Sequence, residues 1–121
     1  MKYAGVLAHF TGDLSMPLHT TRDYDGKKGA DGAWVQRGIH ARIDAFPERH
    51  GLSSKEISQH LEPTQLEDVW AEVLHCIEES HKRVGRCYEL DAQGTMERPT
   101  AESRAFILEC CRCGAQFTLD L

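Results

Sequence analysis

The sequence predicts an all-α fold, a helical bundle. Apolar residues recur at spacings of three and four along most of the chain, as they do on one side of a helix. Polar residues typical of helix starts precede several of these stretches. No stretch alternates apolar and polar residues for five positions between turn signals, so no strand is predicted. The 121 residues suit one domain with a modest core.

The first third of the chain predicts two helices around a loop. A helix is expected over 1–14, and Pro17 lies just beyond its end. The segment 20–32 reads as a loop that holds three glycines and six charged residues, which leaves it free to wall a site. A second helix is expected over 34–46, closed by Pro47 and Gly51, with Trp34 in the core.

The remainder predicts helices that pack against the first two. Ser53 and Glu56 have capping-box spacing, so a short helix is expected to about Leu61. A long helix is then expected from a start signal near Pro63. Its apolar stripe consists of Leu66, Trp70, Val73, Ile77, His81, Val84 and Tyr88. A last helix follows Pro99 and runs to Leu121.

We interpret 1–121 as a single helical domain in which 1–46 carries the site and 53–121 packs against it. The chain begins within a helical pattern and ends without a stop signal, so we expect it to be part of a longer domain. It contains no apolar run of about 18 residues, so no transmembrane segment is predicted. The net charge of −5 argues against binding of nucleic acid or anionic lipid by broad electrostatic attraction.

Histidine and aspartate recur at a spacing that suits metal binding. His9 and Asp13 lie four residues apart on the first expected helix, and His40 and Asp44 repeat this spacing on the second. Residues four apart share one face of a helix, so both side chains of a pair can reach one ion. His19 follows just after Pro17. Imidazole and carboxylate are the ligands of catalytic zinc sites, which use three protein ligands and leave a position for water.

Each pair also has a simpler interpretation. A histidine and an aspartate at this spacing are often an exposed helix pair that contributes a few tenths of a kcal/mol. A plain helical scaffold with chance histidines therefore remains an alternative at this point. The combination of two pairs with an intervening Pro17-Leu18-His19 strengthens the metal interpretation and leaves both interpretations open.

The same residues resemble a known family. The segments His9-Phe10-Thr11-Gly12-Asp13-Leu14, Pro17-Leu18-His19 and Ile39-His40-Ala41-Arg42-Ile43-Asp44 are similar to the core of the zinc-dependent phospholipase C and single-strand-specific nuclease superfamily. The resemblance covers about residues 1–46 and implies a helical fold of that type. Two positions depart from the nuclease pattern: Ser15-Met16 stand where His-Gln is usual, and Ile43 stands where Trp is frequent.

The resemblance implies a cluster of one to three zinc ions. In that pattern His19, His40 and Asp44 hold one zinc, His9 and Asp13 help to hold a second, and Asp13 also bridges to a third. The family completes these sites with upstream residues, whereas only eight residues precede His9 here. One site is therefore complete in this chain, and upstream residues, a homo-oligomer or a second chain are the alternatives for completing the others.

The implied activity is hydrolysis of a phosphodiester, in a nucleic acid or a phospholipid head group, by a metal-activated water. The alternative is a non-catalytic zinc-binding helical domain with an incomplete cluster. Family members are generally exported, which implies a secreted or periplasmic location. Met1–Phe10 itself has no features of a signal peptide.

Overall fold

The computed structural model describes residues 2–121 and confirms that the chain is mainly α-helical. The helices are α1 (Lys2–Ser15), α2 (Ile39–Asp44), α3 (Phe46–Arg49), α4 (Ser54–Ser58), α5 (Val69–Lys82), α6 (Val84–Ala92) and α7 (Ala101–Asp120). A 3₁₀ turn η1 (Pro17–Thr20) and two short strands, β1 (Lys27–Lys28) and β2 (Trp34–Val35), complete the secondary structure. Across residues 2–121, we find no helix with the length and apolarity needed to cross a bilayer.

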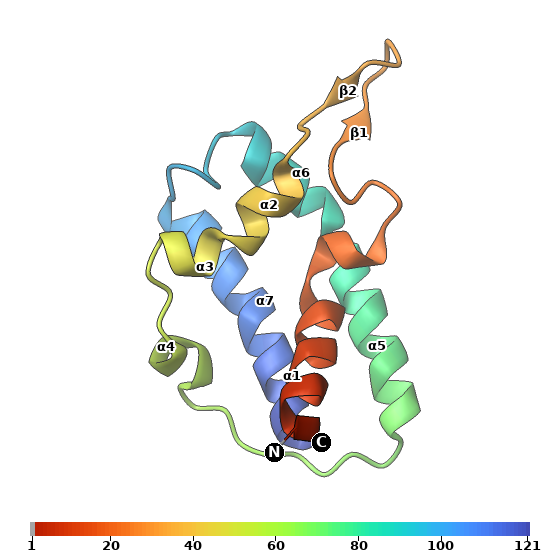
Figure 1. The fold of residues 1–121 in the computed structure, drawn as a ribbon, viewed down its shortest axis with the longest axis vertical. Helices are drawn as coiled ribbons and strands as arrows, with labels where there is room; N and C mark the ends of the chain where they lie inside the picture. The colour runs from red at the N-terminus through yellow and green to blue at the C-terminus, as the bar shows by residue number, and fades with distance from the viewer. Residues whose placement is uncertain (1) are drawn as a thin grey trace.

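Three long helices form the body of the molecule. Figure 1 shows α1, α5 and α7 along the long axis, with α2, α3 and α6 at one end and the β1–β2 hairpin projecting beyond them. Helix α1 packs against both α7 and α5, and α4 packs against α7. The chain therefore brings η1 and α2, which are separated by the hairpin, together at the end of the bundle that holds α6.

The buried core lies at this end of the bundle. Leu18 of η1, Ile39 of α2, Phe46 of α3 and Leu90 of α6 are completely buried in one cluster. In contrast, residues 2–10 of α1 are all exposed. The segments that carry His19, His40 and Asp44 thus rest on the best-packed part of the protein, while most of α1 does not.

Close packing of α1 on α7 depends on Gly114. A Cβ atom at this position would lie 2.5 Å from Ser15 Oγ and 3.3 Å from the carbonyl oxygen of Thr11. Both Ser15 and Thr11 are buried residues of α1. The missing side chain therefore allows the two helices to approach at this level.

The helix expected over 34–46 is shorter than predicted, and a strand that was not predicted precedes it. Trp34 and Val35 pair with Lys28 and Lys27 in an antiparallel ladder, and α2 begins only at Ile39. Gly38 has φ +81°, a left-handed conformation that separates strand from helix without steric cost. Trp34 was expected in the core but is half exposed, with Lys28 and Arg37 over its ring.

The expected long helix is two helices with a later start. Asp68 Oδ1 accepts hydrogen bonds from the backbone N–H groups of Trp70 and Ala71, so the helix begins there rather than near Pro63. Helix α5 then ends at Lys82, and α6 begins at Val84. The predicted apolar stripe is not buried along its length, because Trp70 is exposed.

The predicted capping box at Ser53 and Glu56 is confirmed by its hydrogen bonds. The hydroxyl of Ser53 accepts from the N–H of Glu56, and the Glu56 carboxylate accepts from the N–H of Ser53. This capping box begins α4, which ends at Ser58, somewhat before the expected Leu61. The last helix, α7, begins after Thr100 and extends to Asp120.

We expect Gly114→Ala to lower the free energy of unfolding by about 1–2 kcal/mol, because the added methyl group overpacks the α1–α7 contact. Gly85→Ala in α6 is the matched control, since a Cβ there has no neighbour within 4 Å. This control should stabilise the protein by about 0.5–1 kcal/mol through helix propensity. Urea denaturation of both variants measures the difference. A Gly114→Ala variant as stable as Gly85→Ala would contradict the close contact.

Candidate metal centre

His19, His40 and Asp44 lie together at the end of the bundle. One donor atom from each residue can be chosen so that all lie within 4.8 Å of one another. The Nε2 atoms of His19 and His40 are 2.9 Å apart, and His40 Nε2 lies 3.4 Å from Asp44 Oδ2. Two segments separated by the hairpin thus contribute to one group of donors.

Burial of neighbouring residues directs these side chains outward. On η1, Pro17 and Leu18 are completely buried, and His19 follows them at the surface. On α2, Ile39 and Ile43 are buried, so the residues that follow each of them, His40 and Asp44, occupy the adjoining face. The local pattern of a buried residue followed by a donor therefore explains how the group forms.

The other two predicted ligands adjoin this group. Asp13 Oδ1 lies 3.3 Å from His19 Nδ1, and Asp13 Oδ2 lies 3.2 Å from His9 Nε2. Asp13 therefore connects the pair on α1 with the group on η1 and α2. The side chain of His9 is 74% exposed, compared with 30% for His19 and 31% for His40. All five residues singled out by the sequence form one continuous series of contacts.

Residues that the sequence analysis did not single out support His40. The carboxylate of Asp25 accepts a hydrogen bond from the backbone N–H of His40 at 3.2 Å. The ring of Tyr24 meets the His40 ring edge-on, with centroids 6.1 Å apart. Both come from the segment expected to be a loop. Its charge and glycine content predicted a wall for the site, but nothing in the sequence indicated which residue would turn inward.

His81 of α5 contacts the end of η1. Its Nδ1 lies 3.0 Å from the carbonyl oxygen of Thr20, one residue after His19. The sequence placed His81 on an apolar helical stripe, whereas the side chain lies near the surface and links α5 to η1. The contact helps to hold the turn that presents His19.

An ion pair anchors α2 to α6. Arg42 donates from Nε and Nη2 to the two carboxylate oxygens of Asp91, at 2.7 and 2.8 Å. Gln36 donates to the same carboxylate at 3.0 Å. Burial raises the pKa of Asp91, but the hydrogen bonds from Arg42 and Gln36 outweigh it, so the pKa is lowered from its ordinary value of 3.8.

The two histidines have a spacing close to that of zinc ligands. Zn–N bonds of about 2.0–2.1 Å place two tetrahedral imidazole nitrogens about 3.3 Å apart, slightly more than the 2.9 Å between the two Nε2 atoms. A small outward rotation of either ring would provide the difference. Three protein ligands leave one position open, and the two histidines line an open depression of about 520 Å³.

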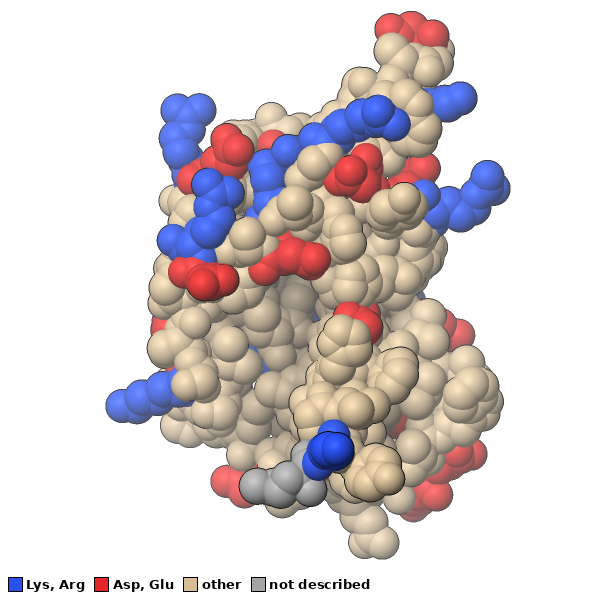
Figure 2. Space-filling model, viewed as in Figure 1, with Lys and Arg blue, Asp and Glu red and all other residues tan. Residues whose placement is uncertain are grey.

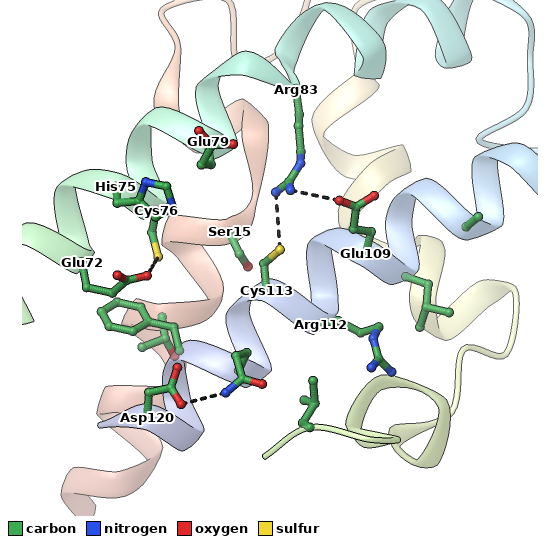
Figure 3. Close-up of a pocket in the computed structure, with 16 residues that line it drawn as sticks. Ser15, Glu72, His75, Cys76, Glu79, Arg83, Glu109, Arg112, Cys113 and Asp120 are labelled. Atoms are coloured by element: carbon green, nitrogen blue, oxygen red, sulfur yellow. Dashed lines mark hydrogen bonds and ion pairs between the residues drawn. The ribbon is translucent and has the colours of Figure 1, made fainter. Parts of the chain in front are cut away.

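A larger cavity, of about 660 Å³, lies between α5 and α7, away from this group (Figure 3). Several of its polar side chains are paired with one another. Arg83 contacts Glu109 and the thiol of Cys113, and the thiol of Cys76 faces Glu72. His19, His40 and Asp44, which we call the metal-type group, do not line this larger cavity. We therefore assign the candidate site to the smaller depression, which His19 and His40 line.

No family model, curated protein or solved structure matches this chain. The donor set, its geometry and its open face are therefore the properties that connect the site with a function.

We expect Asp91→Asn to lower the free energy of unfolding at neutral pH by about 2 kcal/mol, because the variant weakens a largely buried ion pair. Since the folded-state pKa of Asp91 is depressed, its stabilisation is complete above about pH 4 and is lost as the pH falls through that lower pKa. Urea midpoints measured from pH 7 to pH 2.5 should therefore converge for the two proteins at the acidic end. A difference in urea midpoint that stays constant with pH would contradict this assignment. Glu48→Gln, at an exposed position of α3, is the control.

Proposed function

We propose that this chain binds a zinc ion through His19, His40 and Asp44 and hydrolyses phosphodiester bonds. The observation that carries the proposal is that donor atoms of two imidazoles and a carboxylate, from η1 and α2, lie within 4.8 Å of one another. This is a donor set of the catalytic zinc type, with three protein ligands and an open position. Chance pairs on exposed helices would not be expected to converge from separate segments.

The arrangement of the remaining residues supports the same proposal. Asp13 and His9, which the phospholipase C and nuclease resemblance implies help to hold a second zinc, adjoin the group. The mainly helical structure is compatible with a fold of that superfamily. We therefore propose that His9 and Asp13 take part in a second, less complete metal site.

A zinc ion bound here would supply Lewis acidity, which polarises a phosphoryl oxygen and lowers the pKa of bound water to about 7. The chain's own residues prepare the site for this role. Asp13 contacts Nδ1 of His19, which leaves Nε2 as the nitrogen that would bind a metal, with the other ring nitrogen held as in metal-binding imidazoles. Asp25 holds the backbone of His40, and Arg42 holds α2 on the core.

The reaction balances without a further reagent. The oxygen of water bonds to phosphorus, one P–O ester bond breaks, and the released alcohol carries away a proton. A nucleic acid and a phospholipid head group both contain this bond. The depression is open to solvent, so either substrate could reach it.

A second candidate function is zinc binding without catalysis. It is favoured by the exposure of His9, whose side chain has Asp13 as its one ion-pair partner among residues 2–121. A single structural or storage site at His19, His40 and Asp44 would use the same ligands. Metal binding and turnover must therefore be measured separately.

We expect the purified protein to contain about one zinc per chain and His40→Ala to contain almost none. The variant removes the residue whose Nε2 lies next to both other donors, His19 and Asp44. Elemental mass spectrometry after purification without chelator measures the content. His75→Ala, an exposed histidine of α5 outside the group, should retain the wild-type content. Equal zinc in all three proteins would assign the metal to other residues.

We expect hydrolysis of bis(p-nitrophenyl) phosphate by the zinc-loaded protein, with a loss of at least 100-fold in His40→Ala and in Asp44→Asn. Each removes a ligand, whereas Glu48→Gln should retain the rate. Release of p-nitrophenol at 405 nm is the readout. Stoichiometric zinc without turnover would overturn the hydrolase proposal and leave the zinc-binding domain.

A further inference from the structure

Helices α1 and α5 expose an unusually apolar surface, which we call the α1–α5 face. It consists of Tyr3, Val6, Leu7, Phe10, Val69, Trp70 and Leu74. The three aromatic residues are exposed by 88% (Tyr3), 61% (Phe10) and 67% (Trp70). On both helices these residues follow helical spacing, so they form stripes of the kind that normally faces a partner.

The two stripes form one surface. Leu14 of α1 and Ile77 of α5 line the same depression beside the metal-type group. The two helices run side by side in the same direction (Figure 1), so the residues one and two turns earlier on each helix lie at matching levels. Phe10 is therefore level with Leu74, and Leu7 with Trp70. Figure 2 shows mostly uncharged surface over these helices, with a basic side chain close to the start of α1.

The α1–α5 face is large enough for a stable protein contact. With about 200 Å² for an aromatic side chain and about 100 Å² for an aliphatic one, its exposed apolar area is about 600 Å². This equals the upper end of the largest patches on ordinary monomers. It is also most of the roughly 800 Å² that each partner contributes to a standard interface.

The charges around the face favour another protein surface over a membrane. Surfaces that insert into lipid are rimmed by Lys and Arg, whereas α1 carries one basic residue, Lys2, and the start of α5 is acidic at Glu67 and Asp68. The net charge of −5 adds repulsion from anionic lipid. On α1 itself, the basic Lys2 and the acidic Asp13 lie at opposite ends of the helix.

We propose that a second copy of this chain covers the α1–α5 face in a symmetric dimer. A two-fold axis across α1 near Leu7 sets the apolar residues of both copies against one another and brings Lys2 beside the partner's Asp13. Such an isologous contact is self-complementary, as a closed dimer requires. Because the face ends at Leu14 and Ile77, the second copy also adds a wall to the depression at His19 and His40. The proposal rests on the apolar face and does not depend on zinc or on catalysis.

Sedimentation velocity from 1 to 200 μM tests the proposal with the whole chain. We expect a concentration-dependent dimer, with a dissociation constant raised at least 100-fold in Tyr3→Glu and in Trp70→Glu, one variant on each helix. Val35→Glu is the matched control, since Val35 is an exposed apolar residue on the hairpin, and it should dimerise like the wild type. Circular dichroism confirms that each variant is folded.

The outcome is separable from the metal site. His40→Ala and chelator-treated protein should still dimerise, and loss of the dimer in both would overturn the proposed interface because it would place the contact at the metal. A monomer at every concentration would also overturn it. So would a dimer that Tyr3→Glu and Trp70→Glu leave unchanged. Binding of wild-type monomer to neutral phosphatidylcholine vesicles, abolished by Trp70→Glu, would assign the face to lipid instead.

Discussion

The ion pair between Arg42 and Asp91 connects the candidate site to the core, and the position of α2 depends on it. Helix α2 has 6 residues, far fewer than a helix needs to be stable by itself in water. Its conformation is therefore imposed by tertiary contacts: the pair with α6, and the burial of Ile39 and Ile43. His40 and Asp44 inherit their positions from these contacts.

The five candidate ligands differ in how firmly the structure holds them. His19, His40 and Asp44 sit on segments anchored in the buried cluster of Leu18, Ile39 and Phe46. His9 lies in the exposed stretch 2–10 of α1, whereas Asp13 lies between Thr11 and Ser15, which are buried against α7. His9 is therefore the least supported of the five candidate ligands.

The same helix explains why the site and the α1–α5 face are related. Helix α1 contributes Asp13 to the contacts with His19 and contributes Tyr3, Leu7 and Phe10 to the exposed face. Contact along the face would support the turns that precede His9 and Asp13. Burial of apolar surface on α1 would therefore also stabilise the less supported half of the site.

The sequence by itself determined the helical class, the capping box at Ser53 and Glu56, and the identity of the five residues that adjoin one another. The helical class, the capping box and the two His–Asp pairs depend on local spacing, which a single helix or turn already fixes, whereas the approach of His19 to His40 depends on tertiary structure. The long-range features were decided only by the tertiary structure. The sequence did not reveal that 34–35 forms a strand, because a strand pair is stabilised by its partner and by the left-handed Gly38 between strand and helix. Nor did it reveal that Trp70 and Phe10 are exposed, since helical periodicity shows which residues share a face but not what covers that face.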